Sequence, residues 1–155
     1  MEWRRDGYLI STDPALLDIN VIHAFLTTSY WATGISHAKV AQSIAYTPIV
    51  FGLYEHDSAA ARLGRQVGFA RAITDKTTFA YLADVFVLAE HRGKGLGKWL
   101  VECFLTHPDL QWVRFWTLVT DDAHGLYERY GFQHTPHPEW WMEIIGKPPK
   151  GPFPP

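Results

Sequence analysis

The chain of 155 residues has the length of a single domain, and its 47% hydrophobic and 15% aromatic content can form a core and argues against disorder. The formal charge of −2 offers no concentrated basic surface, and no run of about eighteen apolar residues occurs. We therefore expect neither a nucleic-acid partner nor a membrane segment. The N-terminus leads into no apolar signal-peptide segment, which predicts a cytoplasmic protein. Cys103, the single cysteine, excludes an internal disulfide and is expected to be a small buried hydrophobe.

The N-terminal half of the chain alternates between strand-like and helix-like patterns. β-Prone residues, followed by apolar residues at helical spacing, predict one strand and two helices, at residues 8–12, 16–28 and 36–45. Asp13 or Asp18 is a candidate N-cap for the first helix, and Ser36 is one for the second. Three apolar runs then predict strands at residues 49–54, 66–73 and 79–88. Because the connections between these strands are short, an antiparallel meander is expected.

A glycine-rich turn at residues 92–97 follows the third of these strands and leads into a predicted helix at 95–106. Glycines let backbone N–H groups approach an anion closely, and the new helix points its positive end at that anion. The ligand implied is therefore a phosphorylated cofactor. The turn matches neither of two nucleotide-binding motifs. Gly97 comes one position too early for a dinucleotide fingerprint, and Trp99 stands where a P-loop needs a hydroxyl-bearing residue.

The C-terminal part adds a strand, a helix and a final strand, predicted at residues 112–119, 122–130 and 140–145. The strand at 112–119 should pair in parallel with residues 79–87, because a helix separates the two strands and makes a right-handed crossover. Gly131 is a suitable C-terminal glycine for the helix. Pro136 interrupts the pair His134 and His137, so no metal site is predicted. The sequence is read as one domain and a proline-rich tail, over residues 1–146 and 147–155.

Two short motifs in the second half of the chain resemble the signatures of the GNAT N-acetyltransferase superfamily. Arg92, Gly95 and Gly97 occupy the fixed positions of its pyrophosphate-binding motif, Arg/Gln-x-x-Gly-x-Gly/Ala. One helix and one strand later, residues 123–132 match the second signature, Ala-x-x-x-Tyr-x-x-x-Gly-Phe, with Tyr127 at the tyrosine position. The two motifs stand in the family's order and on the expected elements, so together they are far more specific than either is alone.

The resemblance implies both a fold and a cosubstrate. The fold is a mixed α/β (α+β) architecture, in which a mostly antiparallel sheet contains a splayed parallel pair of central strands and is flanked by about four helices. The cosubstrate is acetyl-CoA, whose pantetheine arm would enter the splay and pair with the backbone of Val85, Phe86 and Val87 like an added strand. Its pyrophosphate would bind the glycine-rich turn, where the implied residues are Arg92, Gly93, Lys94, Gly95, Leu96, Gly97 and Lys98.

The implied reaction is direct attack of a primary amine, on a small molecule or a peptide, on acetyl-CoA in a ternary complex. A backbone N–H near Val87 would stabilise the oxyanion, and Tyr127 would protonate the leaving thiolate unless it is only a core aromatic. Asp84 is the candidate base or amine-binding group, with His124 as its rival and a structural ion pair as the alternative. Strand alternation places Asp84 and Val87 on opposite faces, so a catalytic Asp84 requires a bulge.

The acceptor site is the part that the sequence leaves most open. By analogy with the family, aromatic residues on the loop between the first two helices and on the C-terminal segment would line it, namely Tyr30, Trp31 and Trp141. Aromatic walls favour apolar or cationic ligands. A CoA-binding regulatory module without turnover is the alternative function, and the protein is expected to be a monomer or a homodimer.

Overall fold

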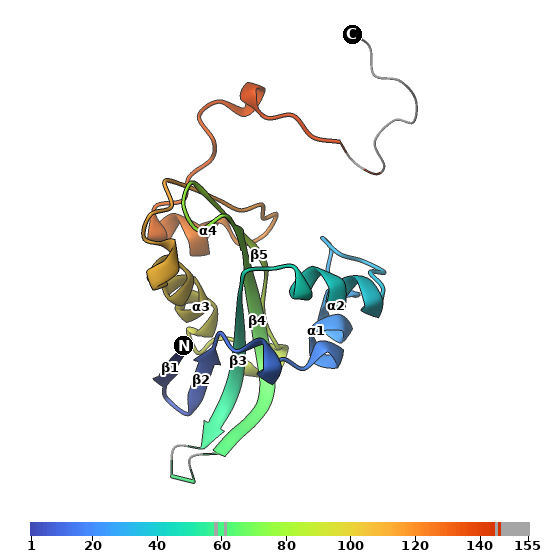
Figure 1. Ribbon diagram of the computed structural model, residues 1–155, viewed down its shortest axis with the longest axis vertical. Helices are drawn as coiled ribbons and strands as arrows, with labels where there is room; N and C mark the ends of the chain where they lie inside the picture. Colours follow the sequence, from blue (N-terminus) through green and yellow to red (C-terminus); the bar gives the residue numbers. More distant parts are fainter. Residues whose placement is uncertain (58, 61, 145, 147–155) are drawn as a thin grey trace.

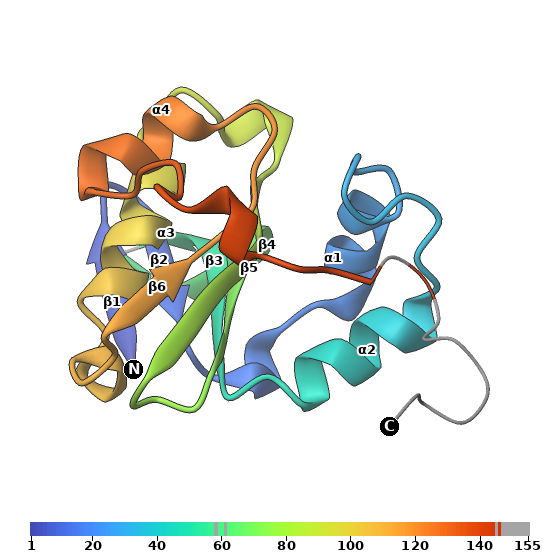
Figure 2. The same cartoon turned by 90° about the horizontal axis from the view of Figure 1, so that it is seen from above.

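The computed structural model describes residues 1–57, 59–60, 62–144 and 146. Within these residues, one six-stranded sheet runs in the order of the sequence: β1 (Glu2–Arg5), β2 (Tyr8–Ser11), β3 (Ile49–Asp57), β4 (Arg62–Thr74), β5 (Phe79–Val87) and β6 (Phe115–Thr117). The helices are α1 (Ile19–Leu26), α2 (His37–Ala45), α3 (Leu96–Leu105) and α4 (His124–Tyr127). Helices α1 and α2 cover one face of the sheet, and α3 and α4 cover the other (Figures 1 and 2). None of the described helices is long and apolar enough to cross a membrane.

The two faces of the sheet carry separate hydrophobic cores because side chains alternate along each strand. On one face, Phe51 and Leu53 of β3 pack with Leu100 and Phe104 of α3. On the other, Val50, Phe69 and Phe86 pack with the apolar sides of α1 and α2. Cys103 lies in the first core and is 2% exposed, so the prediction of a small buried hydrophobe is confirmed. Burial also raises the pKa of its thiol to about 12.

Polar caps decide where the first two helices begin. Asp18 accepts hydrogen bonds from the N–H groups of Asn20 and Val21 and starts α1 later than predicted, while Asp13 caps a separate 3₁₀ turn at Pro14–Leu16. Ser36 caps α2 as predicted. These caps fix the entry points of the two helices on the sheet, and hence the position of the loop that joins them.

The predicted fold class is confirmed: strands β1 to β5 pair antiparallel, and β5 and β6 form the one parallel pair among the described strands. That parallel pairing covers only Phe79–Tyr81 of β5 against Phe115–Thr117 of β6, after which the strands separate. In the described residues the pair lies at one end of the strand order rather than at its centre. Strand β6 is shorter than the predicted 112–119 because the sheet parts at this point.

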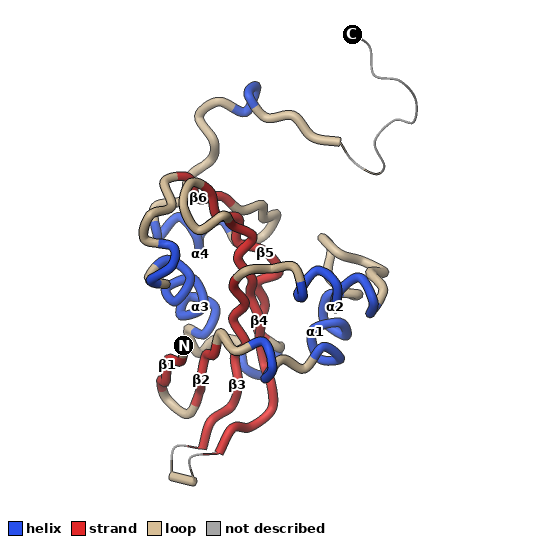
Figure 3. Tube along the Cα trace, in the orientation of Figure 1, coloured by secondary structure: helices blue, strands red, loops and turns tan. Residues whose placement is uncertain are grey.

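The structure differs from the predictions at both ends of the chain. Strand β1 was not predicted. In the structure it forms a tight hairpin with β2, and the two residues of the turn, Asp6 and Gly7, have the positive φ angles that such a hairpin requires, 47° and 78°. Conversely, the predicted strand at 140–145 does not form in the described residues, where Pro138–Trp140 is a 3₁₀ turn and residues 141–144 are irregular (Figure 3). A β-prone segment becomes a strand only when it finds a sheet edge to pair with. Residue 145 and the predicted tail at 147–155 lie outside the described residues.

Candidate functional site

A cleft of about 790 Å³ opens where β5 and β6 part. Its floor is the second half of β5, residues 82–87, which pairs with β4 on one edge and with no described strand on the other. Its walls come from the loop after α1, the glycine-rich turn and the segment leading into α4. The predicted cofactor residues Val85, Phe86 and Val87 line it, as do all members of the turn except Lys94. The structure therefore brings both sequence motifs to one cleft, although they are about one helix and one strand apart in the chain.

The glycine-rich turn presents a row of free backbone donors. Gly93 and Gly95 have φ angles of 80° and 75°, which only glycine adopts without strain. In the part of the chain that the structure describes, no group accepts a hydrogen bond from the N–H groups of residues 93–98. Helix α3 begins at Leu96, so its positive end also faces this turn. The arrangement fits the phosphates that the sequence predicts there.

The charged side chains of the turn do not all face the cleft. Lys98 lines it. Arg92 also lines it, but its Nε donates to the carbonyl oxygen of Val87, 3.0 Å away. The ammonium of Lys94 instead donates to the hydroxyl oxygen of Tyr8, at 2.8 Å. Of the predicted phosphate contacts, Lys94 therefore offers its backbone N–H rather than its side-chain charge.

Asp84 lies in a β-bulge that turns its side chain toward the cleft. The register between β4 and β5 shifts at this point, and Asp84 has a φ of 54°. This is the bulge that a role for Asp84 in the cleft required. One carboxylate oxygen accepts from Nε of Arg71 at 2.5 Å and the other from the indole N–H of Trp31 at 3.1 Å. The carboxylate is thus already held by two donors.

Arg71 is the residue of this site that sequence reasoning missed. It projects from β4, its side chain is 16% exposed, and it also donates to the hydroxyl of Thr47 at 3.2 Å. A single arginine among the buried residues 66–72 was the available signal, because a charge in such a run needs a partner. With Arg71 present, this end of the cleft contains a paired rather than an isolated carboxylate.

Tyr127 reaches the same cleft from α4 and is 8% exposed. Burial, and then the neighbouring Tyr30, Asp122 and Tyr81, raise the pKa of Tyr127 to about 12. Its hydroxyl finds no hydrogen-bond partner within the described residues. The group is therefore a protonated donor at neutral pH that is not committed to another acceptor.

Two of the three predicted acceptor residues line this cleft. Tyr30 and Trp31 pack edge to face, with ring centroids 4.9 Å apart, and the Tyr30 hydroxyl accepts from the N–H of Asp121 at 2.9 Å. That hydrogen bond joins the loop after α1 to the opposite wall. Phe25 stacks on Phe86 at 4.0 Å and completes an aromatic end to the cleft.

Trp141 and His124 lie elsewhere. Both line a second cavity of about 840 Å³, which shares Tyr127 with the first cleft. Trp141 is 53% exposed and stacks on Phe115 with centroids 5.9 Å apart, whereas His124 is exposed and stacks on His134. The structure thus separates Trp141 from the other two predicted acceptor residues and places His124 on the outer side of α4.

Comparison with known proteins gives consistent matches. Residues 49–134 match the family model described as acetyltransferase (GNAT) domain. A proposed acetyltransferase of Gibberella zeae is 37% identical over 147 residues, which cover 84% of this chain and 82% of that protein. The crystal structure of a proposed GNAT-family acetyltransferase from Xanthomonas campestris pv. campestris has a TM-score of 0.82 and 46% identity, and covers 91% of this chain and 94% of its own. A structure from Clostridium acetobutylicum, described as an acetyltransferase with acetyl-CoA, shares the fold at a TM-score of 0.61 and 15% identity, over 89% and 94% of the two chains.

Proposed function

Because the chain belongs to the GNAT family of acetyltransferases, we propose that it moves the acetyl group of acetyl-CoA to a primary amine of a small molecule or peptide, by direct attack in a ternary complex. One observation carries the proposal. The N–H groups of residues 93–98, which have no acceptor within the described residues, lie at the start of α3, beside the edge of β5 from which β6 has separated. Phosphates suit the first feature, and an extended amide chain suits the second. The Clostridium acetobutylicum relative, which shares the fold, supports acetyl-CoA as the ligand.

The residues of the cleft fit the parts of this cosubstrate. Bound acetyl-CoA supplies an activated thioester. The N–H groups of the turn would hold its pyrophosphate, with Arg92 and Lys98 adding positive charge, and the backbone of residues 85–87 would pair with the pantetheine amides. A backbone N–H near Val87 would stabilise the negative charge that develops on the carbonyl oxygen. Tyr127 would donate its proton to the departing sulfur, because its raised pKa keeps the phenol protonated.

The paired state of Asp84 argues for a positioning role at the acceptor end. The carboxylate accepts one hydrogen bond on each oxygen, from Trp31 and from Arg71, so its orientation is already fixed by two donors. It does hold the Trp31 ring against the aromatic wall, where an amine-bearing substrate would lie. We assign Asp84 to fixing this wall, and the amine would lose its proton to water.

The Asp84→Asn variant should therefore raise the KM for the amine while changing kcat little. Asparagine tolerates the positive φ, but it loses the ion pair with Arg71, so its side chain should hold the Trp31 ring less firmly. Leaving the Arg71 charge without its partner should cost about 1–3 kcal/mol of the free energy of unfolding. Steady-state kinetics and a melting curve measure both effects.

A double variant provides the control for this prediction. Adding Arg71→Met to Asp84→Asn removes the unpaired charge and should recover part of the lost stability. A base role for Asp84 would appear instead as a large fall in kcat at unchanged KM. That result would overturn the positioning assignment.

The proposed function is tested by thiol release from acetyl-CoA against a panel of amines, including aromatic amines and peptide N-termini. Calorimetry with acetyl-CoA accompanies the assay. Thiol release above the background without amine is the expected result. Tight acetyl-CoA binding with no release for any amine would instead identify a CoA-binding regulatory module.

A further inference from the structure

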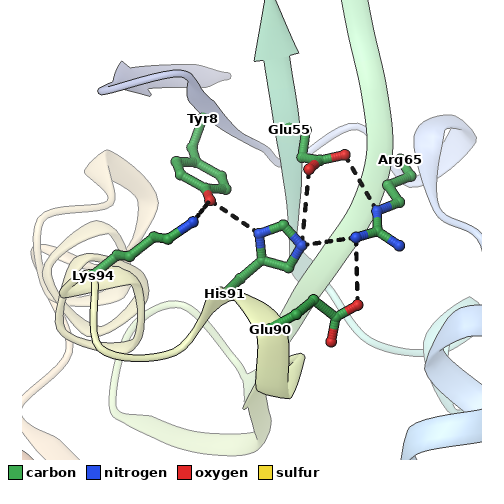
Figure 4. Close-up of polar contacts among 6 residues, drawn as sticks. All are labelled: Tyr8, Glu55, Arg65, Glu90, His91 and Lys94. Carbon is green, nitrogen blue, oxygen red and sulfur yellow. Dashed lines mark hydrogen bonds and ion pairs between the residues drawn. The ribbon is translucent and has the colours of Figure 1, made fainter.

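A cluster of polar side chains lies next to the glycine-rich turn (Figure 4), and its central residue also lines the cleft. His91, which immediately precedes the turn, is its centre and is only 4% exposed. The other members come from separate parts of the chain, and together they form what we call the His91 cluster: Tyr8 on β2, Glu55 on β3, Arg65 on β4, Glu90, His91 and Lys94. Apart from the backbone N–H of Lys94, the site chemistry described above uses no part of this cluster.

The hydrogen bonds of the cluster have a definite direction. Nε2 of His91 is 3.1 Å from Nη2 of Arg65, and an arginine can only donate, so Nε2 accepts. The imidazole proton is therefore on Nδ1 and points to the Tyr8 hydroxyl oxygen, 2.9 Å away. Lys94 donates to that same oxygen at 2.8 Å. Tyr8 thus accepts two hydrogen bonds, one from His91 just before the turn and one from Lys94 within it.

The charges of the cluster are balanced on the far side of His91. Arg65 pairs with Glu55 at 3.2 Å and with Glu90 at 3.3 Å. These contacts hold the guanidinium in place beside Nε2, and they offset the positive charges of Arg65 and Lys94. A carboxylate oxygen of Glu55 also lies 3.8 Å from Nε2 of His91, which is too far for a hydrogen bond, so the shorter contact with Arg65 at 3.1 Å decides the tautomer.

The two glycines of the turn lie in open surroundings. Lys94 lies between Gly93 and Gly95, which both have left-handed φ angles, and no described atom lies within 4 Å of where a Cβ would stand on either glycine. Such residues cost the most backbone entropy when they are ordered. The Lys94 side chain therefore anchors the centre of the turn, and its hydrogen-bond partner is Tyr8.

We propose that Tyr8, His91 and Lys94 are positioning residues that hold the anion-binding turn in its ligand-ready shape, an inference that rests on the proposed function. They act through the backbone donors of the turn and do not touch the reacting atoms. Their loss should weaken acetyl-CoA binding and leave the chemical step unchanged. Without these residues the turn would become ordered only when the ligand binds, and the entropy cost of that ordering would reduce the affinity.

Three variants test the connection between Lys94 and Tyr8. Lys94→Met keeps the stem but removes the ammonium, and Tyr8→Phe keeps the ring, whose centroid is 5.4 Å from the ammonium, but removes the hydroxyl. Each variant should raise the Kd and KM for acetyl-CoA by about threefold to tenfold at unchanged kcat. The double variant should be no weaker than either single one, since both remove the same anchor. Lys39→Met, on the exposed side of α2, is the matched control.

His91 is tested by two substitutions that differ in one hydrogen bond. Asparagine can place an N–H group near the position of Nδ1 and so keep the donor to Tyr8, whereas leucine cannot. His91→Asn should retain most of the acetyl-CoA affinity that His91→Leu loses. Equal loss in the two variants would show that His91 only fills space.

Two results would overturn the proposal. Loss of affinity in Lys94→Met with none in Tyr8→Phe would show that Lys94 binds phosphate directly. Parental affinity in both variants would show that the anchor has no effect. Amide hydrogen exchange of residues 93–98 in the free protein should be faster in both variants, and this measurement does not depend on acetyl-CoA. A parent that fails to bind acetyl-CoA would refute the proposed function alone, and the exchange rates would still decide the anchor.

Discussion

Replacing Tyr127 with phenylalanine should lower kcat by about 10²-fold or more while leaving the affinity for acetyl-CoA unchanged. The substitution keeps the buried ring and its edge-to-face contact with Phe132, whose centroid is 6.0 Å away, so the fold should be preserved. It removes the hydroxyl, which in the described residues has no other partner and is free to protonate a leaving thiolate. Single-turnover kinetics together with calorimetry would separate loss of the chemical step from loss of binding.

Tyr46→Phe is the matched control, because Tyr46 is 81% exposed and does not line the cleft. Parental turnover in Tyr127→Phe would assign the residue to packing and move the proton donor elsewhere. The pH profile provides a second check. Because burial raises the pKa of Tyr127 to about 12, this group should cause no alkaline loss of kcat below pH 10.

The same pKa shift predicts how stability responds to alkali. The phenol of Tyr127 has a higher pKa in the folded protein than its ordinary value of 10.0. Its contribution to stability is therefore fully present below pH 10 and is lost as the pH rises toward 12. Tyr127→Phe lacks this titration, so its melting temperature should fall less steeply than that of the parent in this interval.

Gly95→Val should weaken acetyl-CoA binding by at least about tenfold. A β-branched residue at a φ of 75° is strained by about 1–2 kcal/mol, and its side chain would hold phosphates away from the neighbouring N–H groups. No described atom lies within 4 Å of the position of the new Cβ, so the core is not disturbed. Calorimetry with acetyl-CoA measures the loss.

Gly34→Val is the control for backbone strain at this position. Gly34 has a φ of 73° and an equally open environment, and it does not line the cleft, so the substitution has a similar cost without touching the turn. It should lower the melting temperature by a similar amount and leave acetyl-CoA binding unchanged. Equal affinities for the parent and Gly95→Val, with both folded, would remove the turn from the cofactor site.

Local sequence was sufficient for the elements whose signals are local. The glycine spacing predicted the turn before α3, because glycine permits the left-handed backbone that residues 93 and 95 adopt there. The caps Asp18 and Ser36 and the antiparallel meander were likewise visible, since they depend on neighbours within a few residues. The motif around Tyr127 placed that residue on the helix that reaches the cleft.

Tertiary structure alone decided which groups these elements would meet. Asp84 pairs with Arg71 across a bulge, and Lys94 binds Tyr8, which lies 86 residues away in the chain. The carboxylate of Asp84 is therefore paired, and the side chain of Lys94 does not line the cleft. The segment around Trp141 has the pattern of a strand, yet it does not form one in the described residues. Hydrogen bonds and ion pairs between distant strands depend on register and bulges, which local patterns do not specify. The sequence therefore predicted where the glycine-rich turn and Tyr127 would be, and the packing of the sheet determined how the side chains around them are paired.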